Sequence, residues 1–210
     1  MLDDPQAPVA GEVGAALSGA VDAIAAAGAT VVPGWPEGVD PDRSAEAFGF
    51  GAGLFFAVAQ PGEHEFAPLS AVIAHEERRA RLRAAWARYF AQVDVFVCPV
   101  NLTAAFPHDD RPFEQRTIAT DPGLRPDAKQ PFWTAHAALP GLPALAAPVG
   151  QTRAGLPVGA QIIGPRYEDD TPITFAELLA DVTGGYQPPP VAVRAGMTGS
   201  DPGTPDARGR

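Results

Sequence analysis

Two short apolar runs in the last third of the chain constrain its fold more than any other feature. They cover residues 143–149 and 157–163, each begins with a proline, and the segment from Gly150 to Gly155 joins them. Proline is tolerated at the first position of a strand, where its missing N–H costs little, and glycine is a preferred residue of turns. The pattern therefore predicts a β-hairpin.

Helical periodicity dominates the first ninety or so residues. Apolar residues recur at helical spacing in residues 9–27, and Asp40 followed by Pro41 is typical of a helix N-terminus. We therefore expect helices over residues 9–27, 41–60 and 68–92. The expected core positions of the second and third helices are Phe48, Leu54, Phe55, Val58, Leu69, Val72, Ile73, Leu82, Trp86, Tyr89 and Phe90.

Strand-like segments alternate with these helices. Residues 30–32 are a short β-branched run, and residues 93–99 form an apolar run that is typical of a strand in the centre of a sheet. Thr171 followed by Pro172 predicts the start of one more helix, which ends near Val182. This order of helices and strands predicts the α/β class.

Two segments show little periodicity. Residues 100–130 contain many turn-forming residues, and a loop this long in a compact domain is usually functional or disordered. Residues 184–210 contain 6 Gly and 5 Pro, a composition typical of disorder. We therefore predict one ordered domain over residues 1–183 and a disordered tail over residues 184–210.

Charge and cysteine content exclude several classes of function. The formal net charge of −10 at pH 7 argues against nucleic acid or a membrane surface as a partner, because both attract clustered positive charge. The single cysteine, Cys98, cannot form an internal disulfide. No secretory signal pattern occurs in residues 1–27, so we expect a cytoplasmic protein.

Candidate metal-binding and catalytic groups are few. His75 and Glu76 begin like the helix motif of metalloproteases, but Arg79 stands where its second histidine would be. Two imidazoles therefore cannot face one metal ion. The His-Asp-Asp cluster at residues 108–110 is more typical of a solvated loop than of a catalytic base with its carboxylates. We expect neither a metal site nor a cofactor.

The predicted hairpin is part of a longer motif, GLPALAAPVG at residues 141–150 and GLPVGAQIIG at residues 155–164. Its order, spacing and Gly/Pro placement closely resemble the C-terminal core of the amidase signature family. Similarity on both sides extends this resemblance to residues 2–190. The resemblance implies a partial amidase-signature fold, with a mixed sheet, flanking helices and a C-terminal β-hairpin.

The catalytic residues of that family do not occur in this sequence. The family hydrolyses amides with a serine nucleophile, a second serine and a lysine base, and a Gly-Gly-Ser-Ser-Gly-Gly-Ser segment builds its oxyanion hole. Here no two serines are adjacent, and the single lysine, Lys129, lies in the long loop. A serine hydroxyl is a weak nucleophile without a positioned base. The resemblance therefore implies the C-terminal portion of an amidase, with no catalytic residue of its own.

Two residues ahead of the hairpin motif depart from the family pattern. Ala138 stands where family members commonly have asparagine. Pro131 stands where the A subunits of tRNA-dependent amidotransferases carry an aspartate that binds their glutamine substrate. Pro131 therefore favours the general amidases. The resemblance also implies that five residues in loops beside core strands line a substrate pocket: Asn101, Thr103, Trp133, Thr134 and His136.

These observations leave more than one hypothesis open. The first is a hydrolase of the carbon–nitrogen bond of a small carboxamide that is inactive alone and active only when an N-terminal portion is supplied. The alternative is a non-catalytic remnant or interaction module that pairs with a separate N-terminal chain or with itself, since half of an α/β sheet leaves unpaired edges and apolar faces. A third possibility is a reading frame that begins upstream of Met1.

Overall fold

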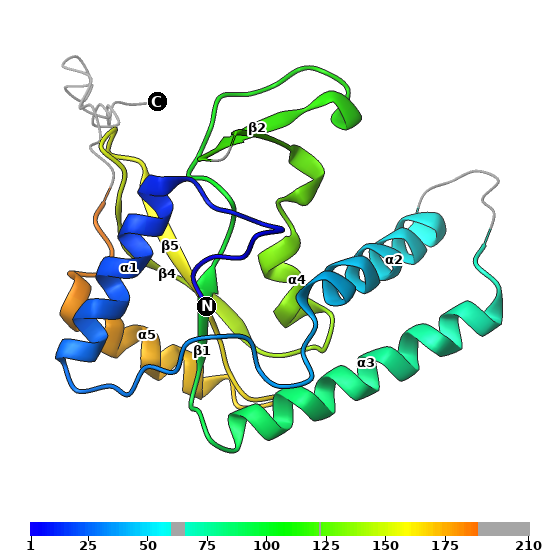
Figure 1. Cartoon of the computed structure of the whole chain (residues 1–210), viewed down its shortest axis with the longest axis horizontal. Helices are drawn as coiled ribbons and strands as arrows, with labels where there is room; N and C mark the ends of the chain where they lie inside the picture. The colour runs from blue at the N-terminus through cyan, green and yellow to red at the C-terminus, as the bar shows by residue number, and fades with distance from the viewer. Residues whose placement is uncertain (60–65, 122, 189–210) are drawn as a thin grey trace, which may run out of the picture.

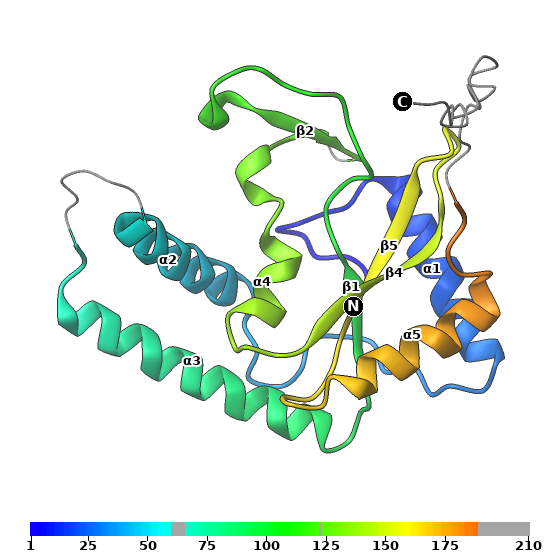
Figure 2. The ribbon, with the colours of Figure 1, turned by 180° about the vertical axis from the view of Figure 1, so that it is seen from behind.

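A three-stranded sheet with helices on both sides forms the centre of the molecule, and two long helices extend from one end of it (Figures 1 and 2). The computed structural model describes residues 1–59, 66–121 and 123–188 of the 210-residue chain. The arrangement confirms the predicted α/β class. The predicted disordered tail falls mostly on residues 189–210, which lie outside the described residues.

The predicted hairpin is present. Strands β4 (Ala144–Gln151) and β5 (Pro157–Ile163) pair antiparallel, with Ala144 opposite Ile163. At the turn, the N–H of Thr152 donates to the carbonyl of Leu156 at 2.9 Å, and the Thr152 hydroxyl accepts the N–H of Leu156 at 3.1 Å. Gly155 has a φ of 77°, which a residue with a side chain rarely adopts. The turn therefore depends on this glycine.

Strand β1 (Phe96–Pro99) pairs with the other edge of β5, which gives the order β1-β5-β4. Every strand pair that the structure describes is antiparallel. The prediction of a central strand over residues 93–99 is wrong, because the strand is shorter and lies at the edge of the sheet. Phe96, Cys98 and Pro99 are buried and Val97 is partly buried. The Met1 ammonium donates to the Val97 carbonyl at 3.0 Å.

The two faces of the sheet are covered by different helices (Figures 1 and 2). Helices α1 (Gly11–Ala26) and α5 (Asp170–Thr183) pack together against β4 and β5. On the other side lies the short helix α4 (Phe132–Ala138), which the sequence analysis did not predict. The side-chain amide of Gln161 on β5 donates to the Trp133 carbonyl of α4 at 3.0 Å. Successive side chains of a strand point to opposite faces of the sheet. Strand β5 therefore contacts α1 and α5 on one face and α4 on the other.

An aromatic cluster fills the space between β1 and α4. Trp35 stacks on Phe96 of β1 and on Trp133 of α4, with ring centroids 5.4 and 5.7 Å apart. The Trp35 indole N–H donates to the buried carboxylate of Asp4 at 2.9 Å. The rings of Phe96 and Trp86 meet edge to face, with their centroids 5.1 Å apart. Segments distant in the sequence therefore meet at Trp35 and Phe96.

The two long helices are α2 (Pro41–Ala59) and α3 (Leu69–Phe90), and their bounds agree with the prediction to within two residues. As expected for an N-cap, the Asp40 carboxylate accepts the N–H of Arg43 at 3.1 Å. None of the described helices has the length and apolar character needed to cross a membrane.

The outer ends of α2 and α3 differ from the predicted core. Phe55, Val58, Leu69 and Ile73 are 66, 76, 73 and 52% exposed, although Trp86 farther along α3 is fully buried. Helical periodicity does identify the apolar residues of each helix. The outer turns nevertheless extend beyond the elements that cover α2 and α3 near the sheet, and periodicity cannot reveal where that cover ends.

The long irregular segment contains structure that was not predicted. Strands β2 (Thr117–Thr120) and β3 (Gly123–Pro126) pair antiparallel, between short 3-10 helices at Phe113–Gln115 and Asp127–Lys129. Strands of four residues are too short to show a periodic pattern in the sequence.

Two smaller predictions are wrong. Residues 30–32 form no strand, and Val31 and Val32 are exposed without a partner strand in the described part of the chain. Helix α5 begins at Asp170, so Thr171 lies inside it. Pro172 is tolerated there because the first N–H groups of a helix have no intrahelical acceptor.

The contact between the end of β5 and α5 leads to a prediction. A Cβ atom on Gly164 would lie 2.5 Å from Cδ and 2.9 Å from Cγ of Pro172. We expect Gly164→Ala to lower the free energy of unfolding by about 1–3 kcal/mol through this overlap, as measured by urea denaturation.

Gly19→Ala in α1 is the matched control. Nothing lies within 4 Å of a Cβ atom at this position, so alanine is expected to raise the free energy of unfolding by about 0.5–1 kcal/mol. Equal stability of Gly164→Ala and the unchanged chain would contradict the packing of α5 against this end of the sheet.

Candidate functional site

A cavity of about 330 Å³ lies beside the segment that follows β1. Asn101 and Thr103 supply its polar side chains, and small apolar residues supply most of its remaining wall. The other lining residues are Val13, Val100, Ala104, Ala105, Ala146, Ala147, Pro148, Pro157, Val158 and Gly159.

Hydrogen bonds fix the segment that carries the two polar residues. The side-chain oxygen of Asn101 accepts the N–H of Leu102 at 2.9 Å. The carbonyl of Leu102 accepts the N–H of Ala10, just before α1, at 2.8 Å, and the Leu102 side chain is fully buried. The segment is therefore held between β1 and α1.

The polar side chains at this cavity offer one amide group and one hydroxyl group. The hydroxyl oxygen of Thr103 is buried and has no hydrogen-bond partner among the described residues. An unpartnered buried hydroxyl is costly. Gly159 of β5 also lines the cavity, where a Cβ atom would contact the Ala147 carbonyl oxygen at 3.4 Å and Cγ2 of Val100 at 3.6 Å.

The other three predicted site residues, Trp133, Thr134 and His136, lie on α4, and none of them lines this cavity. The Thr134 hydroxyl donates to the carbonyl of Pro131 at 3.1 Å. Trp133 is fully buried, and its indole N–H donates to the carbonyl of Ala7 at 3.3 Å. The structure therefore brings together two of the five residues and places three in the packing of α4.

His136 is fully buried in the aromatic cluster. Its ring centroid lies 4.4 Å from that of Trp35 and 5.2 Å from that of Phe132. Neither ring nitrogen has a hydrogen-bond partner in the part of the chain that the structure describes. Burial lowers the pKa of His136 from 6.5 to about 4, although the nearby Asp4 carboxylate acts in the opposite direction. The imidazole is therefore neutral at pH 7.

Cys98 is a poor nucleophile in this environment. Its thiol is fully buried, and Nε2 of Gln161 lies 3.1 Å from Sγ. Burial raises the pKa of the thiol to about 12. Because the thiolate is the reactive form, Cys98 behaves as a buried apolar residue at neutral pH.

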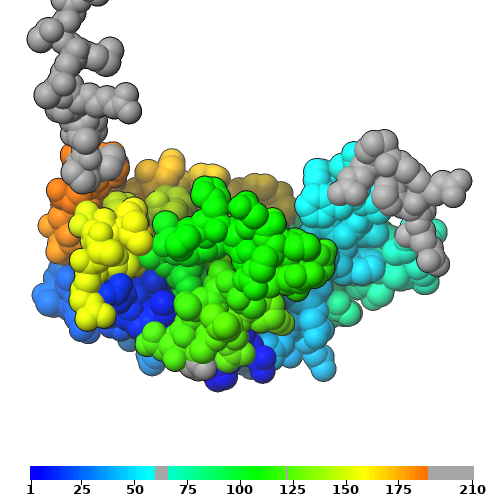
Figure 3. All heavy atoms as spheres, turned by 90° about the horizontal axis from the view of Figure 1, so that it is seen from above, coloured from blue at the N-terminus to red at the C-terminus, as the bar shows by residue number. Residues whose placement is uncertain are grey.

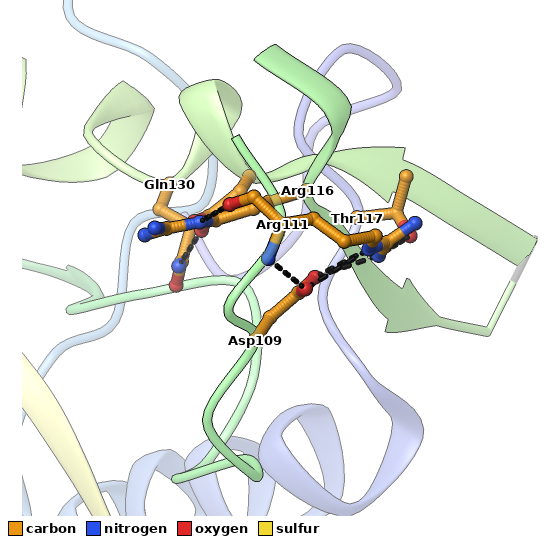
Figure 4. Close-up of polar contacts among 6 residues, drawn as sticks. Asp109, Arg111, Arg116, Thr117 and Gln130 are labelled. Atoms are coloured by element: carbon orange, nitrogen blue, oxygen red, sulfur yellow. Dashed lines mark hydrogen bonds and ion pairs between the residues drawn. The ribbon is translucent and has the colours of Figure 1, made fainter. Parts of the chain in front are cut away.

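The charged loop at residues 108–110 is organised by ion pairing (Figure 4). Arg111 clamps the Asp109 carboxylate, with Nη2 2.6 Å from one oxygen and Nε within 3.0 Å of both. These bonds lower the pKa of Asp109 to about 2. The Nε–H of Arg116 donates to the carbonyl of Arg111 at 2.8 Å. The side chains of Arg111 and Arg116 therefore stabilise the conformation of this loop.

Potential metal ligands are dispersed. Within the described ranges, no three His, Cys, Asp or Glu side chains are grouped so that they could hold a metal ion.

Sequence reasoning missed the part of the site that the hairpin supplies. Ala146 and Ala147 on β4 and Gly159 on β5 form part of the cavity wall, whereas the sequence pattern predicts only that these residues belong to a β-hairpin. A run of small residues where strands usually carry large apolar side chains was the available signal.

A family model described as amidase matches residues 59–172, which is more than half of the chain. The chain belongs to the amidase family. The matched range includes β1, the segment with Asn101 and Thr103, α4 and the β4–β5 hairpin. The resemblance found in the hairpin motif is thereby confirmed.

The curated relatives of this amidase family member match only part of it. The A subunit of glutamyl-tRNA(Gln) amidotransferase from Leptospira interrogans serogroup Icterohaemorrhagiae serovar copenhageni is 28% identical over 109 residues, which are 52% of this chain and 20% of that protein. The chain thus spans about a fifth of the length of such relatives.

Solved structures share the fold over most of this chain. Fatty acid amide hydrolase superposes with a TM-score of 0.63 at 14% identity, over 87% of this chain and 38% of that one. An inhibitor-bound structure, described as an unexpected vestigial protein complex that reveals the origins of an s-triazine catabolic enzyme, has a TM-score of 0.64 at 19% identity, over 88% of this chain and 42% of that one.

The buried imidazole of His136 predicts acid-sensitive stability. The unfolded chain binds a proton at this histidine near pH 6.5, but the folded chain does so only near pH 4. Stability is therefore expected to fall as the pH falls from about 6.5 to about 4, by on the order of 3 kcal/mol.

The measurement is the free energy of unfolding at a series of pH values for the unchanged chain and for His136→Phe, which keeps an aromatic ring in the cluster. The variant should lose much of the slope between pH 6.5 and 4. Parallel curves for the two proteins would show that His136 is not a neutral buried group.

Proposed function

We propose that this chain is the substrate-side, C-terminal part of an amidase that hydrolyses the carbon–nitrogen bond of a small carboxamide. The observation that carries the proposal is the cavity at Asn101 and Thr103. All of its lining residues except Val13 fall within the amidase match, and the hairpin motif supplies part of its wall. The chain has no adjacent serines and only one lysine, so an N-terminal portion must supply the nucleophile and its base.

In this proposal the two cavity residues orient the substrate. The amide group of Asn101 can donate to a substrate carbonyl or accept from its N–H, and the unpartnered Thr103 hydroxyl can do either. The small side chains of the wall leave room for a short acyl group. The other three predicted residues support the site indirectly, because they belong to α4, which packs against the sheet that carries the cavity. They are Trp133, Thr134 and His136.

We further propose a general amidase rather than a tRNA-dependent amidotransferase A subunit. The support is Pro131, which replaces the aspartate expected in that branch. The similarity to an amidotransferase A subunit covers about a fifth of that protein at 28% identity, and it leaves the substrate open.

A second candidate is a non-catalytic module that binds a separate amidase chain. Its support is the lack of paired serines in this sequence, together with the structural likeness to a complex described as vestigial. Binding to an N-terminal amidase segment without any gain of amide hydrolysis would favour this function over the first.

The first expectation concerns activity. The purified chain should release no ammonia from short aliphatic or aromatic carboxamides, because it lacks a base-activated serine. Co-expression with the N-terminal portion of a family member, carrying its Ser-Ser-Lys residues, should produce turnover. Hydrolysis by the chain alone would contradict the proposal.

The second expectation concerns substrate binding in the completed enzyme. Thr103→Val keeps the side-chain shape but removes the hydroxyl, and we expect KM to rise about tenfold with a small change in kcat. Thr183→Val is the control, since that hydroxyl donates to the Leu179 carbonyl in α5, away from the cavity. An unchanged KM for Thr103→Val would remove Thr103 from the site.

A further inference from the structure

Strand β4 has one edge that pairs with no other strand in the described part of the chain. In the order β1-β5-β4 it is the last strand of the sheet, and its other edge pairs with β5. The β4–β5 hairpin, coloured yellow, reaches the molecular surface beside α1 (Figure 3). A sheet edge presents backbone N–H and C=O groups that another extended segment can bond.

The hydrogen-bond pattern of the hairpin determines which backbone groups of β4 point outward. The N–H of Gly164 donates to the carbonyl of Pro143 at 2.9 Å, so these two residues are bonded across the hairpin. Bonded and non-bonded pairs alternate along an antiparallel ladder. The N–H and C=O groups of Ala144 and Ala146 therefore point away from β5, toward the open edge.

The same two alanines are not covered by a helix. Ala146 lies opposite Gln161, whose side chain donates to a carbonyl of α4, so the two alanine side chains lie on the α4 face of the sheet. Both alanines are nevertheless exposed, whereas Ala147, on the opposite face, is buried. Helix α4 therefore does not cover β4.

The open stretch of β4 is short. The strand carries Pro148, which has no N–H to donate, and the register of its pairing with β5 shifts between Pro148 and Gly150. Prolines and bulges both limit the pairing of a sheet edge with an added strand. The stretch that can accept such a strand is therefore residues 144–147.

This stretch adjoins the cavity at Asn101 and Thr103, because Ala146, Ala147 and Pro148 also line that cavity. In the proposed function, a nucleophile from the N-terminal portion has to come within about 3–3.5 Å of a substrate carbonyl in the cavity. The portion that carries the nucleophile must therefore contact the rim of the cavity. Strand β4 is a part of that rim with outward-pointing backbone groups.

An N-terminal amidase portion meets this requirement, and a second copy of the chain does not. A second copy has no adjacent serines and only one lysine, so it cannot supply the nucleophile with its base. The solved structures with the same fold are also much longer, since the matched part is 42% of one chain and 38% of another. More than half of each of those chains lies outside the shared part.

We propose that the N-terminal portion docks on β4 by adding a strand along residues 144–147. The proposal rests on the proposed function, which requires such a portion, and it assigns the place where that portion binds. The added strand bonds to the outward N–H and C=O groups of Ala144 and Ala146. It also closes the side of the cavity that β4 forms.

Amide hydrogen exchange resolved by residue, measured by NMR, tests the edge in the full chain alone. The amides of Ala144 and Ala146 should exchange at least tenfold faster than those of Leu145 and Ala147, which bond to β5. Slow exchange at all four positions would overturn the proposal. Light scattering that gives twice the mass of one chain would then assign the edge to a second copy.

The same measurement on a complex tests the partner. The full chain is co-expressed with the N-terminal portion of an amidase family member that carries its Ser-Ser-Lys residues. In the complex, exchange at Ala144 and Ala146 should slow at least tenfold, while exchange at Leu145 and Ala147 should change little. Failure of the two chains to form a complex would overturn the proposal.

A pair of variants at one position separates the backbone bond from the side chain. Ala144→Pro removes an outward N–H at a residue that does not line the cavity, and proline is tolerated in an edge strand. Ala144→Ser keeps the N–H. The proline variant should lower the yield of purified complex about tenfold, and the serine variant should leave it unchanged. Far-UV circular dichroism checks that both variants fold, and equal yields would contradict strand addition.

Docking and catalysis can fail separately in these experiments. A complex that protects the amides of Ala144 and Ala146 but hydrolyses no carboxamide would support the docking site and contradict the proposed hydrolase. Turnover by a complex in which both amides exchange as fast as in the chain alone would support the hydrolase and overturn the docking site.

Discussion

The packing of this domain depends most on the indole of Trp35. Its ring lies between Phe96 of β1 and Trp133 of α4, and its N–H reaches a carboxylate near the start of the chain. A buried carboxylate is costly unless donors surround it, and Asp4 accepts from both the indole and the backbone N–H of Gln6 at 2.9 Å. One side chain thus combines apolar stacking with a hydrogen bond to a buried carboxylate, and it joins segments that no local pattern connects.

Elements with strong local signals could be predicted from the sequence. The β4–β5 hairpin follows from its prolines and glycines, and α2 and α3 follow from periodicity and, for α2, from the Asp40-Pro41 start. The edge position of β1 could not be predicted, because burial by helices on both faces leaves the same apolar pattern as burial by neighbouring strands. The exposure of Phe55 and Ile73 was hidden for a similar reason, since an apolar face looks the same whether or not its cover is present.

The candidate site was partly predictable for the same physical reasons. Asn101 and Thr103 share a wall because they lie two residues apart just after β1. The position of Trp133, Thr134 and His136 away from this cavity could not be predicted, because no signal in the sequence revealed α4 or the side that it turns toward the sheet. The contribution of Gly159 required the register of the hairpin against β1, which is a tertiary property.

The distribution of aromatic residues also decides what optical methods can detect. The three tryptophans, Trp35, Trp86 and Trp133, each contact another tryptophan or Phe96 within the core. The exposed aromatic residues near the outer ends of α2 and α3 are all phenylalanines: Phe55, Phe56 and Phe66. Intrinsic tryptophan fluorescence therefore reports whether the core is intact. It is insensitive to the outer turns of α2 and α3, which contain no tryptophan. Fraying of those turns would pass unnoticed in a fluorescence melt, and only a backbone probe such as hydrogen exchange would reveal it.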